Sequence, residues 1–321
     1  MATNFARHAT RFGVEVAQSS LATHKGSPVS LTSALEKLKL LQLKQLSRNC
    51  GLSLSGTKPS LVSALVHAVH DKANNKLFET PTRLLSVDLG LRNIAFCQFK
   101  LDSLHEAPQI EKWELVGLEG LEENRSLMQP VFASMALRLV KSAFLKGNIT
   151  PDVILIEQQR IRSGGSSSVC EHIAKINILE GMLHAILQTY MEERTLDIRL
   201  ESVPAKGVMK YWIRDREKIE QMSTGRRYQL TKKAKVTMAE TLLLSPNGSS
   251  FTLTPEVNPF ESESSLKVKR DDLCDSLLQG LGWIIWQRNL HQLGHVNNID
   301  QLQHVMKDID DRYESLLAGP T

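Results

Sequence analysis

The feature that most constrains this chain is an acid placed inside an apolar strand. Residues 84–96 read LLSVDLGLRNIAF, two β-prone apolar runs on either side of a glycine, which is typical of a β-hairpin. Asp88 falls inside the first run, where a charge buried without a partner would cost several kcal/mol. A bound cation or hydrogen bonds would offset that cost, so Asp88 is a candidate metal ligand.

A second acid ends a later strand. Residues 151–157, PDVILIE, have the pattern of a buried strand ending on Glu157, and a helix predicted at 126–146 precedes it. A strand reached through a helix is expected to lie parallel to the first strand. Glu157 would then lie at the carboxyl end of the strand, where crevices open in such sheets.

The loop that follows this strand is rich in phosphate-binding groups. Residues 158–168 contain Arg160, Arg162 and Ser163 among glycines and serines, and guanidiniums with exposed backbone N–H groups suit a phosphodiester backbone. The alternative is an ordinary flexible loop.

A third group of acids opens a C-terminal helix. Residues 269–278 read KRDDLCDSLL and start an apolar helix that continues to about Leu290. Asp272 and Asp275 are three residues apart, hence on one helical face and able to bind a common ion. First-turn acids also cap helices, but capping does not account for Asp275 between apolar neighbours. Asp271 is an alternative to Asp272.

The remaining pattern completes an α/β fold. Strands are predicted at 110–116 and 197–203, helices at 169–193 and 300–317, and a loop insertion at 245–265. The expected architecture is a mixed five-stranded sheet flanked by helices. Acids on two strands and one helix can converge, and oxygen ligands of this kind select hard cations such as a Mg²⁺ pair about 4 Å apart.

Residues 31–70 form a different unit. Leucines at 35–46 supply one helical face, Gly51 is a helix stop, and a second helix is predicted from Lys58 to His70. This helix-loop-helix resembles a SAP motif, a small DNA-binding module in which Lys58 would contact DNA. The alternative is a plain helical hairpin docked on the main domain. Residues 71–82 are expected to be a linker, and 83–321 the main domain.

The N-terminal residues 1–30 contain three basic residues and a single acid, with many Ala, Ser and Thr. This composition resembles a mitochondrial transit peptide. The alternative is a disordered N-terminus without a targeting role.

The distribution of charge matters more than its total, since the formal net charge of the 321 residues is only +4. Residues 206–235 hold ten Lys or Arg against three acids, interleaved with aromatics, as in nucleic-acid surfaces; a solvated helix face is the alternative. The candidate DNA contacts in this run are Lys206, Lys210, Arg226, Arg227, Lys232 and Lys233. The four cysteines have no Cys-x-x-Cys spacing, and no apolar run is long enough for a membrane span, so neither a zinc site nor a membrane partner is expected.

The order of strands and acids resembles the ribonuclease H-like superfamily and its RuvC-like junction endonucleases. Three segments are more specific: VDLGLRN at 87–93, IEQQRIRS at 156–163 and RDDLCDS at 270–276. They resemble the signatures of the fungal mitochondrial cruciform-cutting Holliday-junction resolvases.

This resemblance implies a ribonuclease H-like fold and a homodimer that recognises four-way DNA junctions and makes paired symmetric cuts in the mitochondrial matrix. It implies two Mg²⁺ ions per site, or Mn²⁺ in their place, and no nucleotide cofactor. The implied catalytic, metal-binding residues are Asp88, Glu157, Asp272 and Asp275. The implied DNA contacts near them are Arg92, Asn93, Arg160, Arg162 and Ser163.

Two other classes of protein share parts of this pattern. An actin-like ATPase also begins with an Asp-x-Gly hairpin, but a second such loop and a glycine-rich adenosine motif are missing from the C-terminal half of the sequence. A non-catalytic junction-binding architectural protein would have no need of all four acids.

Overall fold

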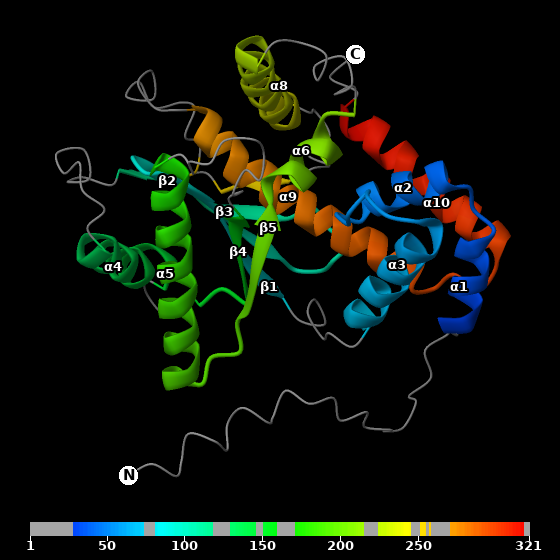
Figure 1. Cartoon of the computed structure of the whole chain (residues 1–321), viewed down its shortest axis with the longest axis horizontal. Helices are drawn as coiled ribbons and strands as arrows, with labels where there is room; N and C mark the ends of the chain where they lie inside the picture. The colour runs from blue at the N-terminus through cyan, green and yellow to red at the C-terminus, as the bar shows by residue number, and fades with distance from the viewer. Residues whose placement is uncertain are drawn as a thin grey trace.

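The computed structural model describes residues 28–73, 81–117, 129–145, 150–158, 171–214, 224–244, 251–254, 257 and 270–317. Its centre is a mixed six-stranded sheet in the order β5-β4-β1-β2-β3-β6 (Figure 1). β2 runs antiparallel to both β1 and β3, whereas β4 is parallel to β1 and β5 is parallel to β4. The strands are β1 (Thr82–Leu89), β2 (Asn93–Leu101), β3 (Gln109–Gly117), β4 (Val153–Gln158), β5 (Arg199–Pro204) and β6 (Thr252–Leu253).

The α/β class and the parallel pairing of β4 with β1 are confirmed, but the expectation of five strands is wrong. A sixth strand, β6, pairs parallel with β3 through Gln109↔Thr252 and Ile110↔Leu253. It falls within 245–265, which the sequence analysis assigned to a loop. Two residues at a sheet edge are too few to produce an alternating pattern, so the sequence carries no signal for this strand.

The predicted hairpin is β1 and β2, which meet at Gly90. The register pairs Asp88 with Ala95 and Leu89 with Ile94. A Cβ at position 90 would lie 2.5 Å from the carbonyl oxygen of Asn93, closer than any side chain permits. The turn therefore requires glycine, and Asp88 is the last residue but one of β1.

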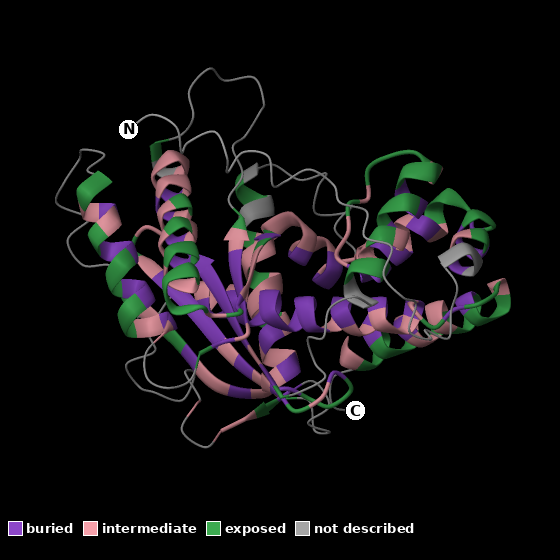
Figure 2. Ribbon diagram, turned by 90° about the horizontal axis from the view of Figure 1, so that it is seen from below, coloured by how far each residue is buried: buried purple, intermediate pink, exposed green. Residues whose placement is uncertain are grey.

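Side chains alternate along each strand, and each face of the sheet has its own core. On one face Leu85, Val87 and Leu89 pack against α4 (Gln129–Leu139), the π-helical turn η1 (Val140–Phe144) and α5 (Glu171–Arg194). On the other face, Leu84 packs in a cluster with α6 (Ala205–Trp212), α8 (Thr224–Leu244) and α9 (Arg270–Leu293). The central strands β1, β2 and β4 are mostly buried between these layers (Figure 2), whereas β3, β5 and β6 are more exposed.

Helix α9 is held tightly on the sheet. The indole N–H of Trp113 donates to the carbonyl of Leu273 (3.0 Å), and that of Trp212 donates to the carbonyl of Leu278 (2.8 Å). Gln279 Nε2 donates to Ser86 Oγ and to the carbonyl of Val87, both at 3.2 Å. These bonds fix the first turns of α9 over the carboxyl end of β1.

The N-terminal region forms three helices, so the expectation of a two-helix unit is wrong. They are α1 (Pro28–Glu36), α2 (Leu40–Asn49) and α3 (Lys58–Ala73). The chain leaves helical geometry at 37–39, although Leu38 stays buried; a leucine periodicity that runs across a break cannot reveal the break. The stop at Gly51 is confirmed, because this residue follows α2 with φ +70°.

These three helices share one core with the end of α9 and with α10 (Ile299–Leu317). Fully buried leucines such as Leu35, Leu43 and Leu65 pack in one cluster with Leu293 and Leu302, and each such side chain contributes about 1.5–3 kcal/mol of burial free energy. Polar contacts cross the same boundary: Asn289 Nδ2 donates to the carbonyl of Asn49 (2.6 Å).

Candidate active site

Strand register brings the two strand acids together. Val87 pairs with Ile156 in the parallel ladder, so Asp88 and Glu157 are the next residues along neighbouring strands. By alternation both side chains lie on the α9 face of the sheet, the face that Leu84 and Leu155 also occupy. Asp88 is only 9% exposed. The predicted convergence of these two strand acids is therefore present.

The chemistry of this pair reflects burial and crowding. Burial raises the pKa of Asp88 well above its usual range, and the nearby carboxylates of Glu157 and Asp272 raise it further. Burial likewise raises the pKa of Glu157. Interaction between the two carboxyl groups raises the pKa of Asp88 and opposes the rise in the pKa of Glu157.

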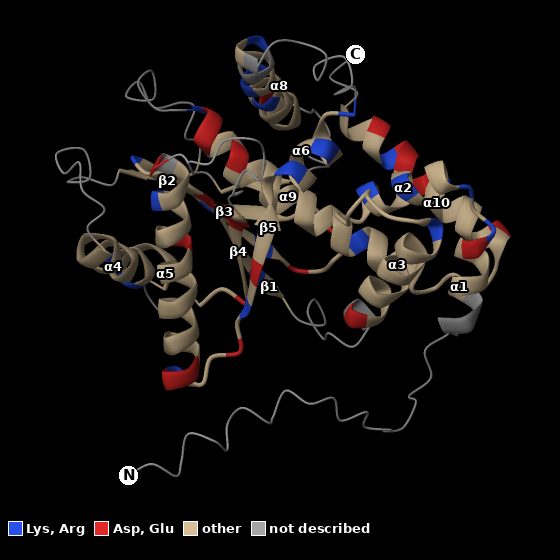
Figure 3. Ribbon diagram, viewed as in Figure 1, with Lys and Arg blue, Asp and Glu red and all other residues tan. Residues whose placement is uncertain are grey.

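The first turns of α9 bring two more acids to the same place. Burial raises the pKa of Asp275 to about 7, and the charges of Asp88 and Asp272 act in the same direction. Asp275 also contributes to the raised pKa of Glu157. Four carboxyl groups from β1, β4 and α9 thus lie within electrostatic reach of one another, and Figure 3 shows the acidic start of α9.

A lysine of α8, absent from the sequence-based site, completes the cluster. Lys235 Nζ donates to Asp275 Oδ2 at 2.6 Å. Burial alone would lower the pKa of Lys235, but the charges of Asp275, Glu157 and Asp88 outweigh it and the pKa is raised. The ammonium group therefore stays charged inside the acid cluster.

A spacing signal for this contact exists in the sequence. Lys232 and Lys235 are three residues apart and share one face of α8, while Asp271 and Asp275 are four apart on α9. Lys232 forms an ion pair with Asp271, and Arg270 forms one with Glu240. In the sequence these lysines are visible only as part of a basic run, since nothing local indicates that α8 packs on α9.

The adjacent residues Asp271 and Asp272 interact with different parts of the structure. Asp271 pairs with Lys232 of α8, and Asp272 contributes to the raised pKa of both Asp88 and Asp275. Asp272 is the residue of the doublet that faces the strand acids.

The donor set suits a hard cation. Its groups are carboxylates, and burial raises the pKa values of three of them. Crowded, desolvated carboxylates of this kind are stabilised by a divalent cation. In the described parts of the chain no three His, Cys, Asp or Glu lie close enough to count as a formed metal centre. The fit therefore rests on donor chemistry and mutual crowding.

The described candidate DNA contacts lie on the β1–β2 hairpin, α6 and α8. Arg92 is exposed in the β1–β2 turn and Asn93 begins β2, just beyond Asp88. Lys206 and Lys210 are half-buried on α6, and Arg226 and Lys233 are exposed on α8. Arg160, Arg162, Ser163 and the side chain of Arg227 lie outside the described residues.

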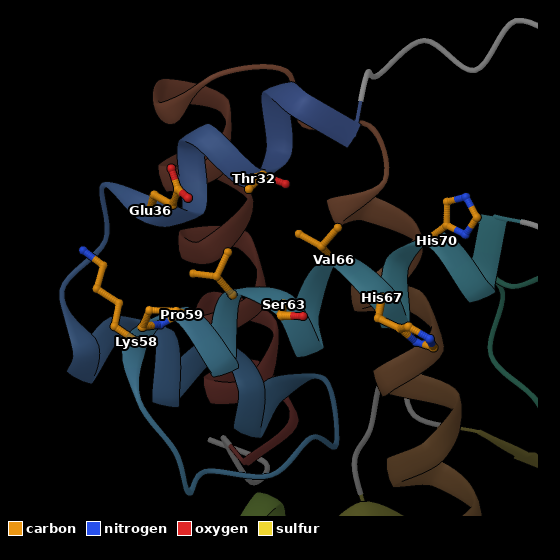
Figure 4. Close-up of a pocket in the computed structure, with 9 residues that line it drawn as sticks. Thr32, Glu36, Lys58, Pro59, Ser63, Val66, His67 and His70 are labelled. Carbon is orange, nitrogen blue, oxygen red and sulfur yellow. The ribbon is translucent and has the colours of Figure 1, made fainter.

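Lys58 lies apart from the acid cluster, at the start of α3. It lines a groove of about 630 Å³ between α1 and α3, together with Val62 and Val66. Figure 4 shows it at one end of the groove, on the same side as Glu36. A contact of Lys58 with DNA would thus be made from the helical region rather than from the sheet.

Comparisons with known proteins agree with this geometry. The sequence profile of the family described as mitochondrial resolvase Ydc2 / RNA splicing MRS1 matches residues 84–293. The chain is 28% identical over 277 residues to the mitochondrial cruciform cutting endonuclease 1 of Schizosaccharomyces pombe, covering 81% of this chain and 96% of that protein. It is 26% identical over 313 residues to the mitochondrial protein of the same name from Saccharomyces cerevisiae, covering 84% of this chain and 87% of that protein.

A solved structure is similar along most of the chain. The crystal structure of the yeast mitochondrial Holliday junction resolvase Ydc2 aligns with a TM-score of 0.54 at 26% identity, covering 85% of this chain and 99% of that one. The matched residues 84–293 include all four acids of the cluster and Lys235. The chain belongs to the Ydc2 family of mitochondrial Holliday-junction resolvases.

Proposed function

We propose that this protein is a metal-dependent endodeoxyribonuclease that binds four-way DNA junctions as a homodimer and resolves them by paired symmetric cuts. The observation that carries the proposal is the meeting of Asp88, Glu157, Asp272 and Asp275 on one face of the sheet, from three separate elements. A structural role would not favour four carboxylates in a desolvated cluster, because their mutual repulsion opposes folding.

These four acids would hold two Mg²⁺ ions, with Mn²⁺ as a substitute. When bound, such ions supply an activated water and stabilise the leaving oxygen of an in-line phosphoryl displacement. Lys235 keeps positive charge beside Asp275 and orients that carboxylate. Asp271 is held away by Lys232, so the α9 ligands in this proposal are Asp272 and Asp275.

Positive groups around the acids would hold the DNA. The candidates are Arg92 and Asn93 in the hairpin turn, Lys206 and Lys210 on α6, and the basic face of α8. We assign phosphate contacts to them and to Arg160, Arg162 and Ser163 of the loop after β4. Lys58 and the SAP-like residues 31–70 would reach a neighbouring arm of the junction, with 71–82 as a linker to the nuclease domain at 83–321.

We place the activity in the mitochondrial matrix, with residues 1–30 as a targeting leader. Both curated relatives are mitochondrial proteins. No described helix is long and apolar enough to cross a membrane.

The test is cleavage of a synthetic four-way junction beside a linear duplex of the same sequence, by wild type and by Asp88→Asn, with Mg²⁺ and with EDTA. We expect paired nicks confined to the junction, lost in EDTA and in the mutant while junction binding persists. Glu114→Gln, a change of an exposed acid on β3, is the matched control and should cut like wild type.

Two outcomes would contradict the proposal. Tight junction binding without cutting under any condition would indicate a non-catalytic architectural protein. A scattering mass of the junction-bound protein that corresponds to one 36.0 kDa chain would contradict the homodimer.

A further inference from the structure

A cavity of about 240 Å³ lies far from the acid cluster, between α6, the middle of α9, α10 and the connection from β2 to β3. Its lining includes Arg288 of α9, thirteen residues after Asp275, which places it about 20 Å further along the helix. Apolar side chains form much of the wall, and two arginines, two tyrosines, an asparagine, a histidine and a serine contribute polar groups. The cavity therefore has the composition of a ligand site rather than of a packing defect.

The two arginines of this wall carry charge without an acidic partner. Arg288 donates through Nε to the carbonyl of Leu104 and through Nη2 to the carbonyl of Glu106. Arg312 Nη2 donates to Asn289 Oδ1 (3.1 Å) and Gln292 Oε1 (2.6 Å). All four acceptors are neutral, and neither guanidinium forms an ion pair within the described parts of the chain.

The proximity of these guanidiniums makes the cavity electropositive. Burial lowers the pKa of Arg288 to about 10, and the charge of Arg312 lowers it further. Burial also lowers the pKa of Arg312, which Asp308 partly opposes. The guanidiniums of Arg288 and Arg312 are both partly desolvated and both line the cavity. An anion bound between them would stabilise their like charges.

The phenol of Tyr211 adds a fixed donor. Tyr211 is 2% exposed and lines the cavity, yet its hydroxyl makes no hydrogen bond to any other described residue. Edge-to-face contacts with Trp212, Trp286 and Tyr313 lock the ring in place. A bound acceptor in the cavity could take a hydrogen bond from this hydroxyl.

We propose that this cavity binds a small amphiphilic anion, with its oxyanion held by Arg288, Arg312 and the Tyr211 hydroxyl. Its apolar body would lie against Ile284 and Leu316, which line the same space. The volume is below the roughly 300–1,000 Å³ of sites for drug-sized ligands, so the ligand is of the size of a single-ring carboxylate. A DNA strand is too large for this space.

The test is calorimetric titration of the full-length protein with benzoate, compared with benzamide, its neutral isostere, and with inorganic phosphate. We expect saturable binding of benzoate, at least about tenfold weaker binding of the other two, and a benzoate affinity reduced about tenfold or more by Arg312→Gln. Tyr211→Phe keeps the ring contacts and should weaken benzoate about threefold to tenfold. Arg194→Gln, which removes a guanidinium stacked on Tyr190 in α5, is the control and should leave binding unchanged.

Three results would overturn the proposal. They are the lack of saturable benzoate binding at millimolar concentration, equal binding of benzoate and benzamide, and phosphate binding as tight as benzoate. Thermal unfolding of each variant shows whether it is folded; if Arg312→Gln is not, the Tyr211→Phe titration decides, and an affinity equal to wild type contradicts the site. These titrations and unfolding measurements do not depend on junction cleavage, so they test the cavity independently of the proposed function.

Discussion

At the scale of single residues, the adjacent aspartates at the start of α9 should differ sharply in their effect. Asp272 faces the strand acids, whereas Asp271 pairs with Lys232. We expect Asp272→Asn to lower the single-turnover rate of junction cleavage by more than about 100-fold, beyond the loss typical of a group that only supports a ligand. Asp271→Asn should stay within about threefold of wild type, and the reverse order would show that Asp271 is the ligand.

A second comparison at this scale separates two lysines of α8. Lys235 donates to Asp275 and is largely buried, whereas Lys233 is exposed. Lys235→Met should lower the cleavage rate about 10–100-fold without changing the dissociation constant for the junction. Lys233→Met should leave the cleavage rate of the bound junction unchanged and weaken junction binding. The slope of log binding constant against log salt concentration should fall by about 1 in magnitude.

Rates from single-turnover cleavage and constants from binding at several salt concentrations check this pair of lysines. Wild-type cleavage by Lys235→Met would contradict the positioning role of Lys235. So would a loss of junction affinity matching that of Lys233→Met.

At the scale of elements, the position of α9 on the sheet depends on a glycine. A Cβ on Gly280 would lie 2.2 Å from Cε2 of Phe99 on β2, whereas a Cβ on Gly181 of α5 meets nothing within 4 Å. Gly280→Ala should lower the free energy of unfolding by about 1–3 kcal/mol, because α9 must move off the sheet. Gly181→Ala should raise it by about 0.5–1 kcal/mol through helix propensity. Urea unfolding measures both, and equal stabilisation would contradict the close approach.

The sequence predicted the elements in which apolar residues recur at a regular spacing. Three local patterns predicted that the four acids of the candidate site converge. They are the alternation of β1 and β2, the apolar run of β4 and the three-residue spacing of Asp272 and Asp275. The contact of Lys235 with Asp275 joins residues 40 positions apart and depends on how two helices pack. Strand β6 and the break between α1 and α2 lack a period long enough to detect.

At the scale of the whole molecule, the N-terminal helices and the nuclease sheet are coupled through α9. Leu35, Leu43 and Leu65 share a core with Leu293 and Leu302, so removing residues 1–73 would expose that apolar surface. We expect this truncation to lower Tm by at least about 10 °C or to cause aggregation, since each buried leucine contributes about 1.5–3 kcal/mol.

Removal of residues 1–27 alone leaves that core intact and is the control for the longer truncation. Scanning calorimetry compares the two proteins with the full chain. A truncation at 73 with the Tm of the full chain would show that the helices fold independently of the nuclease domain.

The indoles that fasten α9 have an optical consequence. All four tryptophans of the chain lie against this helix or on it: Trp113 and Trp212 donate to its carbonyls, and Trp283 and Trp286 belong to it. All four are buried. The tryptophan emission of the unlabelled protein therefore reports the surroundings of one helix, the helix that carries Asp272 and Asp275. A ligand that displaces this helix should change the intrinsic fluorescence spectrum.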